Sequence, residues 1–121
     1  MGLDAENPPR LEITRRVDDG VGEIALQGEL DLATAGDLEA AFSQVVAERP
    51  RAVLLDLSAL EFMDSTGIKT LLQLERRCGK SDVRFALTEG SGAVSRLFAL
   101  TQLDRHFEVF GSRDAARSAL A

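Results

Sequence analysis

An apolar run followed closely by a helical pattern constrains this chain more than any other feature. Residues 52–57, Ala-Val-Leu-Leu-Asp-Leu, are predicted to form a buried strand because nearly every side chain is apolar. Residues 58–63 are predicted to be a short link, which leads to Asp64 and Ser65. Apolar side chains then return at the 3.6-residue spacing of a helix, at Ile68, Leu71 and Leu72. A strand, a link and a helix in this order are typical of an α/β protein.

The predicted helix begins with a carboxylate and a hydroxyl, those of Asp64 and Ser65. The first N–H groups of a helix lack internal partners, and the N-terminus carries a partial positive charge. A phosphate on Ser65 would therefore meet an anion-binding site. The simpler interpretation is that Asp64 or Ser65 only caps the helix, as such residues commonly do.

The N-terminal part of the chain predicts a β-hairpin. Apolar and polar side chains alternate over residues 11–14 and again over residues 22–27, which is the pattern of half-buried strands. Between them, the segment Asp18-Asp19-Gly20 strongly favours a turn, because glycine tolerates a positive φ. Two short strands around such a turn predict an antiparallel pair.

Two further helices are predicted with hydroxyl caps. Thr34 precedes a helix that bears an apolar stripe and ends near Arg49, before Pro50. Ser112 precedes a last helix, with the apolar stripe Ala115, Ala116, Ala119 and Leu120. The second helix is expected to end at Cys78-Gly79, and the remaining elements are a strand over 83–87, a short helix over 94–101 and an edge strand over 107–110.

The predicted fold is α/β. It is a single mixed β-sheet of four to five strands, an N-terminal antiparallel hairpin followed by parallel β-α units, flanked by about four helices. Residues 11–121 are expected to form one domain, and residues 1–10 a flexible lead-in. Function in open α/β sheets gathers at the carboxyl ends of parallel strands. Asp64 and Ser65 lie just past such an end, and Asp31 shares it if the second strand is parallel to the third.

The charge balance restricts the partners and the compartment. Twenty acidic residues against 14 basic ones give a net charge of −6, which argues against nucleic acid and anionic membranes as partners. The single cysteine, Cys78, is interpreted as a half-buried apolar residue, with redox sensing a minor alternative. Without a signal-peptide pattern or a run of about 18 apolar residues, the chain is expected in the cytoplasm, as a monomer or weak dimer.

The chemistry of an enzyme is not apparent, so no catalytic residue, metal or cofactor is predicted. A serine nucleophile needs a base, and the only histidine, His106, is expected on the surface of a polar link. One Cys and one His provide no metal cluster. A phospho-accepting Asp56, as in bacterial receiver domains, is a second class to weigh. It would need the acidic pair Asp18-Asp19 and a lysine after the last strand, and none follows Phe110.

Four segments together resemble a known family. They are Gly28-Glu29-Leu30-Asp31, Leu55-Asp56-Leu57-Ser58, Phe62-Met63-Asp64-Ser65-Thr66-Gly67-Ile68, and Arg96-Leu97-Phe98-Ala99-Leu100 with Leu103. In order and spacing they resemble STAS domains, and more narrowly bacterial anti-sigma factor antagonists, over roughly residues 11–120. The resemblance therefore implies the STAS fold for the domain.

The resemblance also implies a switch. In that family the serine of an Asp-Ser-x-Gly motif is phosphorylated by the anti-sigma factor, a serine kinase, and a PP2C-type metal-dependent serine phosphatase removes the phosphate. The unphosphorylated form binds the kinase and frees the sigma factor. Ser65 matches the phosphorylated serine, with Thr66 a minor alternative. The implied partner-binding residues are Asp31, Asp64, Ser65, Thr66, Gly67, Ile68 and Lys69.

Two points stay open at the level of sequence. Lys69 stands where the family commonly has a small residue, which puts the identity of the partner in question more than the switch. The alternative function is that of a STAS subunit of another assembly, a stress-signalling complex or a lipid-transport system, without regulation at Ser65.

Overall fold

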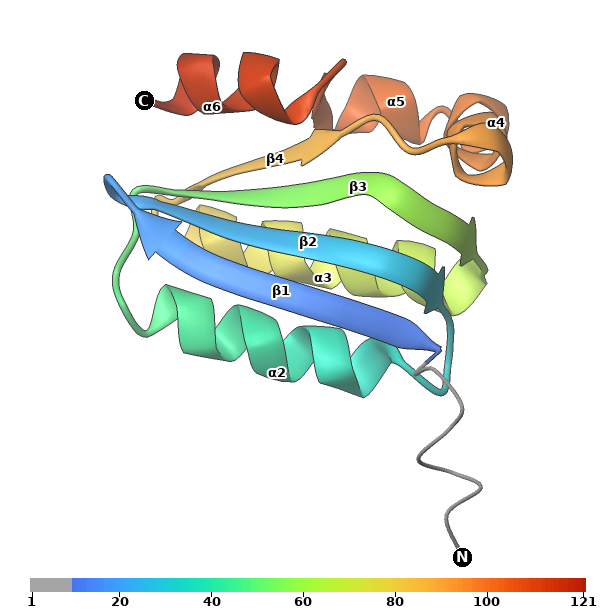
Figure 1. Cartoon of the computed structure of the whole chain (residues 1–121), viewed down its shortest axis with the longest axis horizontal. Helices are drawn as coiled ribbons and strands as arrows, with labels where there is room; N and C mark the ends of the chain where they lie inside the picture. Colours follow the sequence, from blue (N-terminus) through green and yellow to red (C-terminus); the bar gives the residue numbers. More distant parts are fainter. Residues whose placement is uncertain (1–9) are drawn as a thin grey trace, which may run out of the picture.

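A mixed five-stranded sheet in the order β1-β2-β3-β4-β5 forms the centre of the molecule (Figure 1). The computed structural model describes residues 10–121, so the predicted lead-in over residues 1–10 lies almost wholly outside the described residues. In chain order the elements are β1 (Leu11–Asp18), β2 (Val21–Leu30), α2 (Ala35–Val46), β3 (Ala52–Met63), α3 (Ser65–Lys80), β4 (Arg84–Thr88), α4 (Gly92–Thr101), α5 (Leu103–His106), β5 (Glu108–Phe110) and α6 (Arg113–Leu120).

The predicted hairpin is confirmed. Strands β1 and β2 are antiparallel, and Asp18 pairs with Val21 across a two-residue turn. Asp19 and Gly20 both have a positive φ, 53° and 76°, as a type I′ hairpin turn requires. The turn chemistry of the sequence therefore sets the register of the first strand pair.

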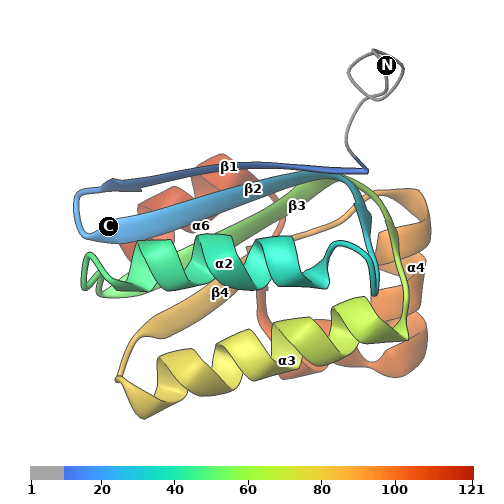
Figure 2. The same ribbon diagram turned by 90° about the horizontal axis from the view of Figure 1, so that it is seen from below.

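The remaining strands are parallel, as the alternation of strands and helices predicted. Helices α2 and α3 cover one face of the sheet and α6 the other (Figure 2). The larger core lies under α2 and α3, and the smaller one, which contains Leu54, Ala116 and Leu120, lies under α6. Because strands β2 to β5 are parallel, their carboxyl ends lie at one edge of the sheet, where the site described below lies.

The predicted link over residues 58–63 is wrong, because β3 continues to Met63. The pairing of β2 with β3 shifts register twice, between Ala25 and Gln27 and between Gly28 and Glu29. An irregular ladder of this kind breaks the period-two alternation of side chains. The sequence pattern therefore resembles a link although the backbone stays paired.

Three smaller predictions also need correction. Thr34 makes no side-chain capping bond; its hydroxyl donates to the Glu29 carbonyl oxygen instead. A short helix, α5, lies within the segment expected to be a polar link. In α6 only Ala116 and Leu120 are buried, while Ala115 and Ala119 are exposed, because one short helix touches the sheet along a narrow line.

Candidate functional site

Asp64 caps helix α3 and holds its first turn in place. Its backbone is extended, and its Oδ1 atom accepts hydrogen bonds from the N–H groups of Thr66 at 2.9 Å and Gly67 at 3.1 Å. Its carbonyl oxygen accepts from the Ile68 N–H at 3.1 Å. The two side-chain bonds satisfy the Thr66 and Gly67 N–H groups, which have no partner within the helix, and the third is the first backbone bond of the helix itself. The capping role anticipated for this pair of residues therefore falls to Asp64.

This cap changes the expectation of an anion site at the helix start. The N–H groups of Thr66 and Gly67 already bind a carboxylate, so a phosphate cannot take them without displacing Asp64. Ser65 is the first residue of the helix and is exposed to solvent. A phosphate on its hydroxyl would stand on the protein surface, next to the charge of Asp64.

One helical face carries the remaining candidates. Ile68 and Lys69 lie three and four residues after Ser65, so all three side chains share a face of α3. Ser65 and Lys69 are exposed, whereas Ile68 is half-buried and packs against the core. An exposed lysine keeps its ammonium group in water. That group is therefore a cation available to a ligand or partner at this face.

Gly67 is buried and allows α3 to approach the sheet closely. A Cβ atom on Gly67 would lie 2.4 Å from Cγ of Met63 and 3.0 Å from the Leu30 carbonyl oxygen. The contact at 2.4 Å would require the Met63 side chain to move. The contact at 3.0 Å is with a backbone oxygen, which has little room to give. Gly67 thus positions Ser65 through packing rather than through a surface of its own.

Asp31 lies at the same edge of the sheet, as the sequence predicted for a parallel second strand. Leu30 pairs with Met63 at the ends of β2 and β3, and the Asp64 N–H donates to the Leu30 carbonyl oxygen at 3.3 Å. The residues that follow these two strand ends, Asp31 and Asp64, are therefore neighbours in the fold.

The Asp31 carboxylate is buried and fully engaged by its surroundings. Its Oδ1 atom accepts from the N–H groups of Ala33 at 3.0 Å and Thr34 at 3.2 Å, and its Oδ2 atom forms an ion pair with Arg10. Arg10 also lies 3.3 Å from a carboxylate oxygen of Glu29. These contacts fix the loop between β2 and α2 near the start of α3, and they bring in Arg10, which sequence reasoning missed.

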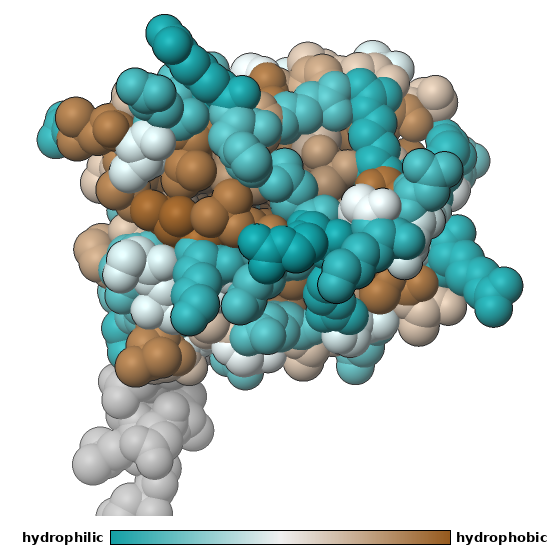
Figure 3. Space-filling model, turned by 180° about the vertical axis from the view of Figure 1, so that it is seen from behind, coloured by the Kyte–Doolittle hydropathy of each residue, from teal (hydrophilic) through white to brown (hydrophobic). Residues whose placement is uncertain are grey.

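Sequence reasoning also missed exposed apolar side chains at this edge. Leu32, which follows Asp31, is 80% exposed, and Phe62, two residues before Asp64, is 44% exposed. Figure 3 shows apolar side chains gathered toward the end of the molecule where α4 and the start of α3 lie. We define the Ser65 surface as Leu32, Phe62, Ser65, Ile68 and Lys69. Exposed apolar side chains next to a hydroxyl and a charge are typical of protein interfaces.

The histidine and the acidic residues considered for catalysis or phosphate transfer do not lie beside Ser65. His106 ends α5 and its Nε2 atom is 2.6 Å from a carboxylate oxygen of Glu75, so it is tied to α3 rather than free in a link. Asp56 lies within β3, not at its end, and the Asp18-Asp19 pair belongs to the hairpin turn. Among residues 10–121, no group of three or more His, Cys, Asp or Glu side chains is placed to bind a metal ion.

Asp56 is instead bound locally. Its Oδ1 atom accepts from the N–H of Ser58 at 3.0 Å and from the hydroxyls of Ser58 at 2.7 Å and Thr88 at 2.9 Å. Partial burial raises the pKa of the Asp56 carboxyl, but these hydrogen bonds and the charge of Arg113 outweigh it and hold the pKa below its ordinary value. The carboxylate is therefore a structural tie between β3 and β4.

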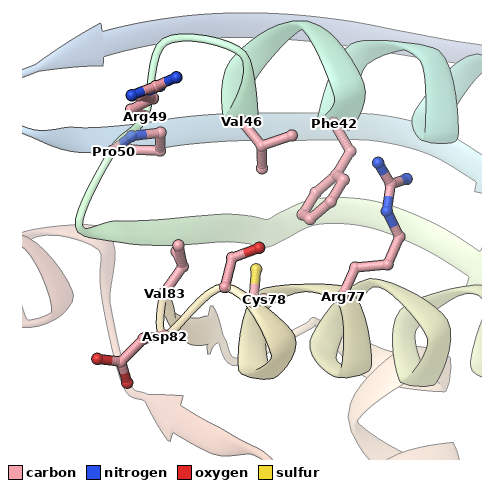
Figure 4. Close-up of a pocket in the computed structure, with 9 residues that line it drawn as sticks. Phe42, Val46, Arg49, Pro50, Arg77, Cys78, Asp82 and Val83 are labelled. Carbon is pink, nitrogen blue, oxygen red and sulfur yellow. The ribbon is translucent and has the colours of Figure 1, made fainter.

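A pocket of about 480 Å³ lies between α2 and α3, toward the C-terminal ends of both helices and away from Ser65 (Figure 4). Phe42 and Val46 line it from α2, and Arg77 and Cys78 from α3. The Arg77 guanidinium lies 4.8 Å from the centre of the Phe42 ring. Cys78 is fully buried rather than half-buried, and burial raises the pKa of its thiol to about 11. A thiol of this kind is unreactive at neutral pH.

The fold is thus an α/β domain with an exposed serine and exposed apolar side chains just past the ends of its parallel strands. Residues 12–116 match the family model of the STAS domain, so the chain belongs to the STAS domain family. No helix of the described residues has both the length and the apolar character needed to cross a membrane.

Similar proteins include several anti-sigma factor antagonists, and the chain belongs with this group of STAS proteins. Anti-sigma-F factor antagonist RsfB of Mycobacterium tuberculosis is 36% identical over 105 residues, which cover 87% of this chain and 85% of RsfB. A crystal structure of an anti-sigma factor antagonist from Mycobacterium paratuberculosis has a TM-score of 0.81 and 35% identity, and the match covers 91% of this chain and 93% of that one.

The antagonist SpoIIAA has the same fold at lower identity. Its unphosphorylated form has a TM-score of 0.75 at 22% identity and covers 89% of this chain and 93% of its own. Its phosphorylated form, from Bacillus, has a TM-score of 0.71 at 20% identity and covers 91% of this chain and 100% of its own. At this identity the likeness concerns the fold alone.

Proposed function

We propose that the chain is an anti-sigma factor antagonist that phosphorylation of Ser65 switches off. In the unphosphorylated form, the Ser65 surface binds an anti-sigma factor serine kinase in the cytoplasm, and the sigma factor is released. The kinase transfers a phosphate to Ser65, and a PP2C-type serine phosphatase removes it. The domain itself catalyses nothing.

One observation carries this proposal: Ser65 is exposed at the edge of the sheet that also holds two hydrogen-bonded carboxylates and the exposed apolar residues Leu32 and Phe62. The hydroxyl is accessible to a kinase, while Asp64 and Asp31 are held by backbone N–H groups and by Arg10. The two carboxylates position the loops around Ser65 rather than acting on it. The matches to relatives named as antagonists span 87% and 91% of this chain, which supports the proposal.

The physical basis of the switch is charge at an interface. A phosphate adds about −1.5 to −2 charges at neutral pH. Ser65 lies between apolar Phe62 and Ile68 in the chain and next to Asp64, so a docked partner would have to desolvate this dianion beside another carboxylate. Like charges brought together at an interface cost several kcal/mol. The fold tolerates the same phosphate, because Ser65 is exposed to solvent at the positive end of a helix.

The test combines phosphate transfer with binding. Wild-type, Ser65→Ala, Ser65→Glu and Thr66→Ala proteins are incubated with the anti-sigma factor kinase of the source cell and labelled ATP, and binding to that kinase is measured separately. Wild type and Thr66→Ala should each take up one phosphate, seen as a single mass increment. Ser65→Ala should bind without label. Ser65→Glu should bind about hundredfold more weakly or worse.

Two outcomes would contradict the proposal. Label that persists unchanged in Ser65→Ala assigns the phosphate to another residue. Wild-type protein that binds no kinase and takes up no phosphate, and that carries none when isolated from its own cell, favours a STAS subunit of another assembly. Thr66→Ala is the matched control, since it removes a neighbouring hydroxyl from the same helical turn.

A further inference from the structure

Strand β1 is an open edge of the sheet. It is the outermost strand in the order β1-β2-β3-β4-β5, and Figure 2 shows no other element of residues 10–121 beyond it. Its pairing with β2 runs from Leu11 to Asp18 without a register shift, and it contains no proline. A regular edge strand of this length is a template for a further strand, unless its side chains prevent pairing.

The direction of the backbone groups along β1 follows from one hydrogen bond. The Arg10 carbonyl oxygen accepts from the Glu29 N–H at 2.8 Å, so Arg10 and Glu29 form a hydrogen-bonded pair. Such pairs alternate along an antiparallel ladder. Residues 12, 14, 16 and 18 therefore direct their N–H and C=O groups toward β2. Residues 11, 13, 15 and 17 direct theirs outward, to the free edge.

The side chains on one face of β1 carry opposite charges at positions symmetric about Thr14. Glu12 lies two residues before Thr14 and Arg16 two residues after it, and all three residues are exposed. Within residues 10–121, neither Glu12 nor Arg16 forms an ion pair. If a second copy lay antiparallel with a two-fold axis at Thr14, each Glu12 would face Arg16 of the other copy.

The pairs on either side agree with this register. Leu11 would lie opposite Val17 of the second copy, and Ile13 opposite the aliphatic stem of Arg15. These residues direct their backbone groups outward, so each pair can exchange hydrogen bonds. The next pair outward, Arg10 and Asp18, again has opposite charges, although Arg10 contacts Asp31 and Asp18 contacts Arg117 within one chain.

Neighbouring registers are unfavourable. An axis at Arg15 would place two Arg15 side chains opposite each other and Glu12 opposite Asp18. An axis at Ile13 would place Arg10 opposite Arg16. Like charges directly opposite in a ladder are destabilising, whereas opposite charges stabilise it. Among these three symmetric pairings, only the axis at Thr14 brings opposite charges together throughout.

We propose that two copies of this chain associate through β1, antiparallel about Thr14, to form one continuous sheet. The free edge of β1 therefore binds the β1 strand of a second copy. The charge order along the strand, Arg10, Glu12, Arg16 and Asp18, favours this partner because it is complementary to itself in the antiparallel direction. The proposal is independent of the proposed function, because it concerns the β1 edge of the sheet and not the Ser65 surface.

Charge reversal tests this register. Sedimentation equilibrium over a concentration series gives the dimer dissociation constant of wild type, Glu12→Arg, Arg16→Glu and the double variant. Each single reversal places like charges opposite each other twice per dimer and should weaken association roughly tenfold to hundredfold. The double variant should recover association. An equimolar mixture of the two single variants should also associate, because every position 12 then faces a position 16 of opposite charge.

Controls separate this effect from net charge and from folding. Glu39→Arg and Arg76→Glu change exposed charges on α2 and α3 by the same amounts and should leave the dissociation constant unchanged. Arg16 lies opposite Glu23 in β2, so its reversal is checked by thermal unfolding. Arg15→Pro is a second test, because it removes an outward N–H that β2 does not use and should abolish association. Monomeric sedimentation of wild type at every concentration overturns the proposal, as does association that the reversals leave unchanged.

Discussion

At the scale of single residues, Asp64 has a structural task that can be separated from its charge. Asparagine caps a helix about as well as aspartate, whereas alanine does not. We therefore expect Asp64→Ala to lower the free energy of unfolding by about 1 kcal/mol, since the Thr66 and Gly67 N–H groups lose their acceptor. Asp64→Asn should stay within a few tenths of a kcal/mol of wild type. Urea denaturation of the three proteins measures both values.

Equal stability of the alanine variant and wild type would show that water replaces the cap at no cost, and would leave Asp64 free for a role at the interface. If Asp64→Asn is stable but binds the proposed kinase differently, the charge of Asp64 acts on the partner. Stability and binding together therefore distinguish a capping role from a contact role.

Some residues of this edge could be predicted from the sequence and others could not, for a physical reason. Asp64 and Ser65 could be placed because a cap precedes the apolar stripe of a helix, and Asp31 because parallel strands end together. The exposure of Leu32 and Phe62 could not be predicted, since both are large apolar residues that ordinarily count as core. The contact of Arg10 with Asp31 joins residues 21 positions apart, and no local pattern reports such a contact.

At the scale of elements, β3 and β4 are held together by side chains where their backbone ladder ends. The last paired residues are Leu55 and Leu87. Beyond them the Leu57 N–H donates to the hydroxyl of Thr88 at 2.8 Å, and that hydroxyl donates to Asp56. Thr88 is buried, so the two bonds are shielded from water. This arrangement lets β3 diverge from β4 and continue alone beside β2 toward Ser65.

Replacing Thr88 by valine keeps the shape of the side chain and removes both bonds. We expect the free energy of unfolding to fall by about 1–3 kcal/mol at neutral pH, because the buried Leu57 N–H loses its acceptor. Thr101→Val is the matched control, since Thr101 is exposed and bonds only to carbonyl oxygens of its own helix. A loss no greater than that of the control would show that the tie contributes nothing.

Thr88→Val should also change how the free energy of unfolding depends on pH in the acid range. The pKa of Asp56 is lowered in the folded protein, so its ionised form adds stability above its unfolded pKa, which is lost as the pH falls through the folded value. Without the Thr88 hydroxyl, one cause of the lowering is gone. The Asp56 contribution should then be smaller and should disappear at higher pH than in wild type, as urea titrations across the acid range would measure.

At the scale of the whole molecule, the sequence predicted the order of the strands and helices better than their lengths. Periodicity distinguishes helices from strands, and the crossover rule makes the later strands parallel. The true length of β3 and the existence of α5 depend on contacts between distant segments, such as Asp56 with Thr88 and His106 with Glu75. Those contacts do not leave a local signal in the sequence.

The sheet also separates the two proposed surfaces from each other. The free edge of β1 and the end of β3 that leads to Ser65 are separated by β2, or about 10 Å of sheet. Changes at such distances usually add without coupling. We expect Glu12→Arg, which weakens the proposed dimer, to leave the affinity for the kinase within about twofold of wild type. Ser65→Glu should conversely leave the dimer dissociation constant unchanged.

Both constants can be measured on the same four proteins: wild type, the two single variants and their combination. Arg10 links the two regions, because it precedes β1 and pairs with Asp31. If the combined variant shows coupling, adding Arg10→Ala should remove it. Coupling that persists without Arg10 would mean that pairing at β1 moves the Ser65 surface through the strands themselves, and the two surfaces would then form a single regulatory unit.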